Sequence, residues 1–134
     1  MMFALNKIDY ANLNSKQQEN FNFQKASAKL ADYGFNCLRL SDDWNGADFI
    51  ALHINGSHIK VQLKGRLVTD PKYIGKEIYI MFEDKEYAQW YLYPHDELIT
   101  YNLNMHPDRT FTESGHSRGK LSKENKVWLE PYKV

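Results

Sequence analysis

The chain has 134 residues, and its formal charge is zero because 17 lysine and arginine residues balance 17 aspartate and glutamate residues. This length fits a single compact domain, and 43% hydrophobic residues with only 7 glycines and 4 prolines are typical of an ordered globular protein rather than a disordered or linker-rich one. The zero net charge argues against a strongly basic protein that coats nucleic acid without specificity.

The first element expected along the chain is a helix over residues 15–33, which Asn14 or Ser15 can cap. Apolar residues recur within it at helical spacing, and Gly34 can end it as a left-handed cap. Glu19 lies at the edge of the apolar stripe of this helix. Its position therefore suits either an ordinary surface residue or a group at the border of the core.

A hairpin is the next expected feature. After a strand over residues 35–40 and a polar turn over residues 41–46, two extended runs cover residues 47–54 and 57–64. Asn55-Gly56 joins these runs and is the strongest short hairpin signal in the sequence. We expect the two runs to pair as antiparallel strands.

The remaining elements complete a mixed domain. A basic loop leads to a strand over residues 77–82, whose nearly continuous apolar character is typical of a strand buried on both faces. A strand over residues 90–93, a short helix over residues 94–102, a loop over residues 104–119 and a last helix capped by Ser122 follow. The pattern predicts an α/β domain, bordering on α+β, with a mixed central sheet flanked by helices.

The cysteine content indicates the cellular compartment. The chain has a single cysteine, Cys37, which has no partner for an internal disulfide bond. A lone thiol in a small packed domain is typical of a buried residue in a reducing compartment. The first ten residues lack the apolar run of a signal peptide, and no apolar run reaches the length that spans a bilayer. We therefore expect a cytoplasmic protein with no membrane partner.

The loop of the hairpin decides which polar residues share a face. Alternation places Gln62 and Lys64 on one face of the second strand, and Asp48 is the acid on the first. With a two-residue turn at Asn55-Gly56, Asp48 lies on the other side of the sheet from Gln62. With a three-residue loop over residues 54–56, it lies directly opposite Gln62. Turn statistics favour the shorter loop, and periodicity leaves both registers open.

Asp48, followed on the next strand by Gln62-Leu63-Lys64 and preceded by a helix that carries Glu19, resembles the PD-(D/E)XK nuclease superfamily. The order of elements over residues 15–101 is similar to the restriction-endonuclease-like core of that superfamily. Residues 104–134 would then form a C-terminal extension of a single nuclease-like domain.

The resemblance implies a metal-dependent endonuclease that hydrolyses the phosphodiester bonds of DNA, with Mg²⁺ as the metal and Mn²⁺ as a substitute. Asp48 would be the main metal ligand. The coordination shell of the metal would be completed by the amide oxygen of Gln62, the backbone carbonyl of Leu63 and, directly or through water, Glu19. Lys64 would orient or help to deprotonate the attacking water and would stabilise negative charge.

Two residues depart from the family pattern: Ala47 stands in the place of a proline, and Gln62 in the place of the usual acid. Glutamine there resembles a minority of the superfamily in which some members are active and others are not. Because glutamine carries one negative charge fewer than the usual acid, we expect weaker metal binding at this site. The alternative is a non-catalytic nucleic-acid or protein interaction module on a degenerate nuclease fold. Under that hypothesis, Asp48 belongs to a turn or strand edge, and Gln62 and Lys64 are polar side chains on a sheet face exposed to solvent.

Positive charge is concentrated between residues 60 and 76, where five basic residues accompany one acid, and residues 109–134 carry six basic residues against three acids. Four of these basic residues suit phosphate contacts as well as they suit an ordinary charged surface: Lys60, Arg66, Lys72 and Lys76. One chain offers one active site, so cutting both strands of a duplex requires either a dimer or two encounters, and we expect a homodimer. The sequence does not separate DNA from RNA as the substrate.

Overall fold

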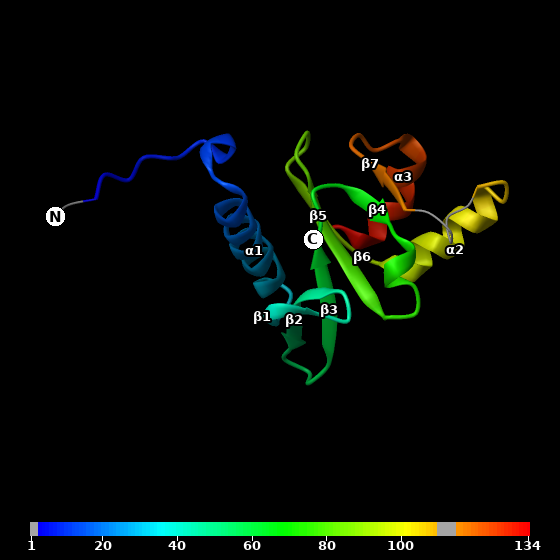
Figure 1. Ribbon diagram of the computed structural model, residues 1–134, viewed down its shortest axis with the longest axis horizontal. Helices are drawn as coiled ribbons and strands as arrows, with labels where there is room; N and C mark the ends of the chain where they lie inside the picture. The colour runs from blue at the N-terminus through cyan, green and yellow to red at the C-terminus, as the bar shows by residue number, and fades with distance from the viewer. Residues whose placement is uncertain (1–2, 110–114) are drawn as a thin grey trace.

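The computed structural model describes residues 3–109 and 115–134. Its central sheet has five strands: β1 (Phe35–Trp44), β2 (Ala47–His53), β3 (His58–Leu63), β5 (Ile78–Asp84) and β6 (Gln89–Pro94), in that spatial order. β3 and β5 are parallel, and the other neighbouring pairs are antiparallel. The structure thus confirms the predicted mixed α/β domain (Figure 1).

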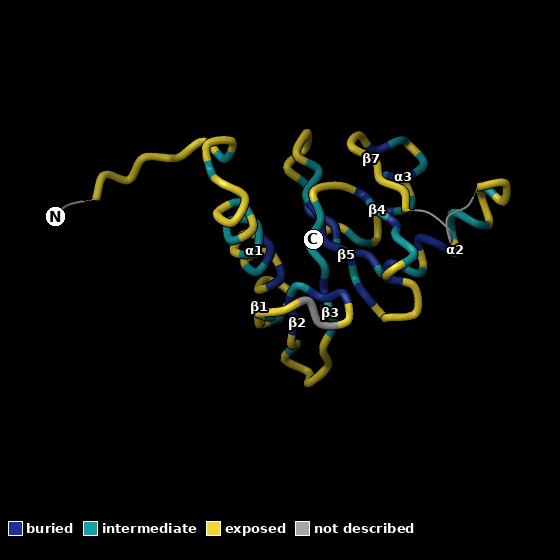
Figure 2. Tube along the Cα trace, viewed as in Figure 1, coloured by how far each residue is buried: buried dark blue, intermediate teal, exposed yellow. Residues whose placement is uncertain are grey.

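Helices cover both faces of the sheet (Figure 1). On one face lies α1 (Ser15–Ala31), whose Ala26 and Leu30 are buried against residues that include Phe49 and Val61. On the other face lie α2 (His95–Met105), α3 (Lys123–Leu129) and a small two-stranded sheet of β4 (Leu67–Thr69) and β7 (His116–Arg118). Short 3₁₀ turns occur at η1 (Tyr10–Asn12), η2 (Pro71–Tyr73) and η3 (Glu130–Tyr132). Figure 2 shows that the most deeply buried stretches belong to the central strands.

The ends of α1 follow from its flanking residues. The Asn14 side chain accepts a hydrogen bond from the Gln17 N–H, and the Gln17 side chain accepts one from the Asn14 N–H, both at 2.9 Å, so the two form a capping box. The helix ends at Ala31, because the next two residues tighten into i→i+3 hydrogen bonds. Gly34 then takes a left-handed φ of 85°, as predicted for a residue that ends this helix.

The predicted turn over residues 41–46 is wrong in its length. β1 continues to Trp44, which pairs with Ala47, and the connection shrinks to Asn45-Gly46. Both residues have positive φ, 52° and 84°, which is the geometry of a two-residue hairpin turn. This tight turn places the start of β2, and therefore Asp48, directly beside the end of β1.

Two predicted loops contain short strands. β4 lies in the basic loop after β3, and β7 lies in the predicted loop over residues 104–119, of which residues 110–114 fall outside the described part of the chain. The two strands pair in an antiparallel register that joins Leu67 to Arg118 and Thr69 to His116. Leu121 and Leu129 beyond them are buried in the main core. The C-terminal residues are therefore part of the packed domain.

Residues 3–9 extend away from the sheet and are exposed (Figure 2). Among the described residues, no helix combines the length and the apolar character that crossing a membrane requires.

Candidate active site

The β2–β3 hairpin adopts the longer of the two loops that the sequence left open. Its strand register, continued by one residue, places Asp48 directly opposite Gln62. The His53 N–H donates to the Ser57 carbonyl at 2.8 Å and closes a three-residue loop, and Gly56 has a φ of 91°. The two side chains therefore share one face of the sheet, so the two-residue turn that turn statistics favour does not form here.

Contacts with the end of α1 fix this loop. The Ile54 N–H donates to the Gly34 carbonyl at 3.0 Å, and His53 Nε2 lies 3.0 Å from the Tyr33 carbonyl oxygen. With a two-residue loop, Ile54 would belong to β2 and would not be placed to donate its N–H to the Gly34 carbonyl beside the helix end. A long-range contact thus sets the register on which the site depends.

Asp48 and Gln62 bring two oxygen donors together. Asp48 Oδ2 accepts a hydrogen bond from the Leu63 N–H at 2.8 Å, which holds the carboxylate against β3. Gln62 Oε1 is buried and has no hydrogen-bond partner among the described residues. A buried acceptor left unsatisfied costs about 1–3 kcal/mol, so the position of this amide oxygen is explained if it binds a cation.

Lys64 follows Gln62 on the same strand face, and its Nζ lies 5.4 Å from the centroid of the Tyr73 ring. The ring is buried, and it packs so close to Gly46 that a Cβ added there would lie 3.0 Å from Tyr73 Cδ1. Burial raises the pKa of the Tyr73 hydroxyl, while the charge of Lys72 opposes the shift. Tyr73 is therefore a neutral, fixed support beneath the Lys64 ammonium group.

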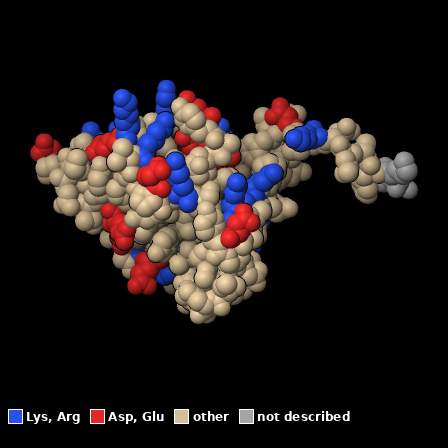
Figure 3. Space-filling view, turned by 180° about the vertical axis from the view of Figure 1, so that it is seen from behind, with Lys and Arg blue, Asp and Glu red and all other residues tan. Residues whose placement is uncertain are grey.

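A cleft of about 790 Å³ unites Asp48, Gln62, Leu63, Lys64 and Glu19. Glu19 enters it from α1, and its Oε2 lies 3.6 Å from Lys16 Nζ and 3.7 Å from Arg39 Nη2. The charged residues that line it in the described part of the chain balance, with four basic and four acidic side chains: Lys16, Arg39, Lys64 and Lys85, and Glu19, Asp42, Asp48 and Glu83. The cleft thus has no excess positive charge of its own, and charges of both signs also alternate over the back of the molecule (Figure 3).

The predicted phosphate contacts lie outside the residues that line this cleft: Lys60, Arg66, Lys72 and Lys76. Lys72 forms an ion pair with Asp70 at 4.0 Å instead. Sequence reasoning missed Lys16, Arg39 and Lys85, which do line the cleft. They come from α1, β1 and the β5–β6 turn, and no local pattern in the sequence connects these segments.

The oxygen donors around Asp48 suit a hard divalent cation. Mg²⁺ commonly binds through one or two carboxylates and keeps several water ligands, and the Asp48 carboxylate with the Gln62 amide oxygen provides such a partial shell. In residues 3–109 and 115–134, no three His, Cys, Asp or Glu side chains form a metal-binding group. A metal at Asp48 would thus rely on one nearby carboxylate and neutral oxygens.

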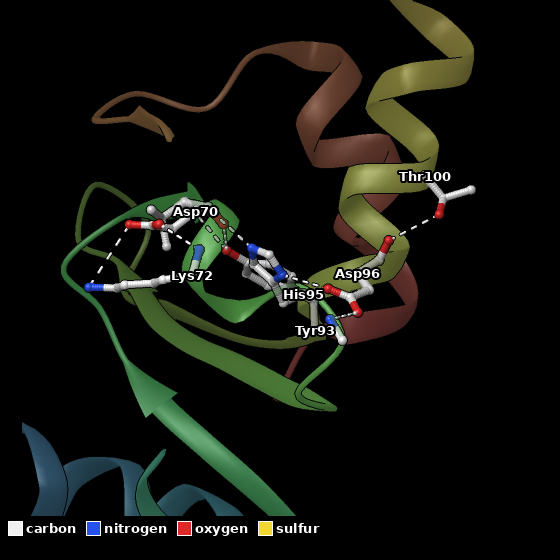
Figure 4. Close-up of polar contacts among 8 residues, drawn as sticks. Asp70, Lys72, Tyr93, His95, Asp96 and Thr100 are labelled. Carbon is white, nitrogen blue, oxygen red and sulfur yellow. Dashed lines mark hydrogen bonds and ion pairs between the residues drawn. The ribbon is translucent and has the colours of Figure 1, made fainter. Parts of the chain in front are cut away.

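A buried histidine, His95, contacts the segment that precedes Tyr73 through Asp70 (Figure 4). His95 is fully buried at the start of α2; its Nε2 accepts a hydrogen bond from the Asp70 N–H at 2.9 Å, and its Nδ1 lies 2.9 Å from Asp96 Oδ1. Because a backbone N–H only donates, Nε2 is the acceptor and Nδ1 carries the proton shared with Asp96. Asp70 begins η2, which carries Tyr73, so His95 ties α2 to the support of Lys64.

Replacing His95 with leucine is expected to lower the free energy of unfolding by about 1–3 kcal/mol, because the Asp70 N–H loses its acceptor while the volume is nearly retained. Urea denaturation measures the change. His58→Leu, at an exposed position on β3, is the matched control and should change stability by no more than about 0.5 kcal/mol. Equal stability of the two variants would show that the His95 hydrogen bonds contribute nothing to the fold.

The arrangement described above is a mixed five-stranded sheet covered by helices on both faces, with Asp48 and Gln62 near the ends of two paired strands. A solved structure of a bacterial homing endonuclease, I-Ssp6803I, is similar to it, with a TM-score of 0.59 over 90% of this chain and 89% of that chain. The two sequences are 18% identical, so the likeness concerns the fold. Neither a family model nor a curated protein sequence matches the chain.

Proposed function

We propose that this protein is a metal-dependent endonuclease that hydrolyses DNA phosphodiester bonds, of the PD-(D/E)XK type with glutamine at the second acidic position. The observation that carries the proposal is the hairpin register, which sets Asp48 opposite Gln62 and leaves the Gln62 amide oxygen buried without a partner. The similarity of the fold to that of a homing endonuclease supports DNA as the substrate.

In the proposed site, Asp48 and Gln62 hold Mg²⁺ or Mn²⁺, together with the Leu63 carbonyl and, through water, Glu19. A cation bound there supplies a water of lowered pKa and neutralises charge on the phosphoryl oxygens. Asp48 is oriented for this role by the Leu63 N–H, and Gln62 gains a partner for its buried oxygen.

Lys64 acts on the water and on the phosphate. Its ammonium group has three donors and no acceptor, so it can orient the attacking water by hydrogen bonding to the oxygen. Its positive charge also stabilises the negative charge that develops on the phosphoryl oxygens in the transition state. The Tyr73 ring limits the directions that the Lys64 side chain can take, which keeps Nζ beside the cleft.

A homodimer accounts for the cleavage of both strands of a duplex, since each chain has one proposed site. The extended N-terminal segment offers a surface for such an association. Phe3, Leu5 and Ile8 on this segment are 85%, 99% and 61% exposed, and an association would remove their apolar surface from water.

The proposal is tested by incubating the protein with labelled duplex, branched and single-stranded DNA, and with RNA of the same sequence. We expect cleavage of DNA with Mg²⁺ or Mn²⁺ and its complete loss in excess EDTA, with activity restored when the metal is added back. Titration calorimetry should show binding of the same cations to the protein alone. No cleavage of any substrate, together with no heat of metal binding, would contradict the proposal and favour a non-catalytic interaction module.

A further inference from the structure

A second cleft, of about 470 Å³, lies between the β4–β7 pair, the end of α2 and α3. Among the described residues, three basic side chains and one acid line it: Arg109, Arg118, Lys120 and Glu124. Unlike those of the Asp48 cleft, where charges balance, the described lining residues of this cleft have an excess of positive charge. A polyanionic substrate would therefore gain more electrostatic attraction here than at the proposed active site.

The acid in the second cleft is already engaged within the protein. Glu124 Oε2 lies 3.1 Å from His106 Nε2, and Glu124 Oε1 accepts a hydrogen bond from the Tyr101 hydroxyl at 3.1 Å. The contact with His106 holds the pKa of Glu124 below its usual value, so the carboxylate stays ionised and bound to its neighbours. The hydrogen-bond partners of Glu124 are thus Tyr101 and His106 rather than Arg118 or Lys120.

The two clefts are neighbours along one stretch of chain. Gly65 lines the Asp48 cleft, Leu67 lines the second cleft, and Arg66 lies between them. Arg66 also approaches β7, since a Cβ added at Gly119 would lie 3.8 Å from Arg66 Nη1. Basic side chains therefore follow one another from Lys64 through Arg66 to the end of β7.

The strand pair that carries these side chains is fixed to the central sheet. The Tyr93 hydroxyl accepts a hydrogen bond from the Val68 N–H at 2.9 Å and donates one to the Val68 carbonyl at 2.7 Å. Burial raises the pKa of Tyr93, which keeps the hydroxyl protonated and able to donate. Because β4 pairs with β7 through Leu67 and Arg118, the hydrogen bonds between Tyr93 and Val68 position both strands, and with them Arg118, relative to β6.

We propose that the second cleft binds the phosphodiester backbone of the DNA whose scissile phosphate lies in the Asp48 cleft, with Arg66, Arg118 and Lys120 as phosphate contacts. This inference rests on the proposed function and assigns a role to the basic C-terminal residues. Such contacts fix the position of a duplex without reading its sequence. The second cleft would thus supply affinity, while the Asp48 cleft supplies the chemistry.

The test compares wild type with Arg118→Ala/Lys120→Ala for binding to a fluorescein-labelled DNA duplex in EDTA, over a range of salt concentrations. We expect about tenfold weaker binding and a slope of log affinity against log salt that is smaller by about 1.8, since each phosphate contact contributes about 0.9. Lys25→Ala/Lys29→Ala removes the same charge from exposed positions on α1 and should bind like wild type. Unchanged affinity and slope in Arg118→Ala/Lys120→Ala would overturn the proposal.

Hydrolysis of bis(p-nitrophenyl) phosphate, which is too small to span both clefts, separates this proposal from the proposed function. Arg118→Ala/Lys120→Ala should keep the wild-type kcat/KM on this compound with Mn²⁺ while losing affinity for the duplex. A parallel loss of both would show that the substitutions disturb the Asp48 site and would overturn the separate binding role. If wild type hydrolyses no phosphodiester at all, the proposed function fails, yet the duplex-binding comparison still decides whether the second cleft holds DNA.

Discussion

Asp48→Asn is expected to lower the rate of metal-dependent DNA cleavage by about 10³-fold or more, because several kcal/mol of charge stabilisation by the metal is lost with its main ligand. Asparagine keeps the side-chain size and an oxygen that can accept the Leu63 N–H, so the hairpin should stay folded. Gln62 cannot compensate, since its amide oxygen is neutral. Single-turnover cleavage of a labelled duplex with Mg²⁺ measures the rate, and calorimetry should show weaker cation binding.

The control for this prediction lies in the same cleft. Asp42→Asn removes one negative charge from an exposed residue of the lining that lies on β1 rather than on the β2–β3 hairpin, and should cleave at close to the wild-type rate. If Asp48→Asn also cleaves within about tenfold of wild type, Asp48 is not the metal ligand, and the assignment of the site is wrong.

The fold was predictable from local patterns where those patterns are strong. The capping residue Asn14 and the terminal Gly34 define α1, and the apolar run of β5 marks a buried strand, which is parallel to β3 and antiparallel to β6. Each of these signals lies within a short stretch of sequence. Such signals predict the element and its approximate bounds without knowledge of its partners.

The site could not be predicted to the same degree, because it depends on contacts between distant residues. Two Asn-Gly pairs occur in the chain: Asn45-Gly46 forms a two-residue turn, whereas Asn55-Gly56 ends a three-residue loop. The difference comes from the hydrogen bond between Ile54 and Gly34, which no local pattern reveals. Sequence reasoning could therefore name Asp48 and Gln62 but could not decide whether they face each other.

The second cleft illustrates the same limit. β4 and β7 are three residues each, too short to show a periodic pattern, and they pair across nearly fifty residues of chain. The excess of basic residues near the C-terminus was visible in the sequence, but the strand that it would pair with was not. The pairing of Leu67 with Arg118 brings β7 next to the stretch of chain that continues from Lys64 and Gly65, which line the Asp48 cleft.

Lys64→Met is expected to reduce DNA cleavage by about 10²–10⁴-fold, the range over which a positioned proton-transfer or charge-stabilising group contributes, while leaving Mg²⁺ binding unchanged. Methionine retains an unbranched stem that can pack on the Tyr73 ring, but it has no charge and donates no hydrogen bond to a water. This separation of rate from metal affinity distinguishes Lys64 from Asp48, whose replacement should reduce both. Single-turnover cleavage over a range of pH, paired with calorimetry, provides the two readouts.

Lys85→Met is the matched control, because Lys85 also lines the Asp48 cleft and its Nζ lies 4.2 Å from the centroid of the Tyr10 ring. The substitution removes the same charge as Lys64→Met, and Lys85 also lies over an aromatic ring. Lys85, however, lies in the turn between β5 and β6, whereas Lys64 follows Gln62 at the end of β3. We expect this variant to cleave at close to the wild-type rate. A similar loss of cleavage in both lysine variants would mean that the cleft requires only positive charge. The assignment of Lys64 to the attacking water would then be wrong, because orienting a water depends on the position of the lysine, whereas a general attraction for phosphate does not.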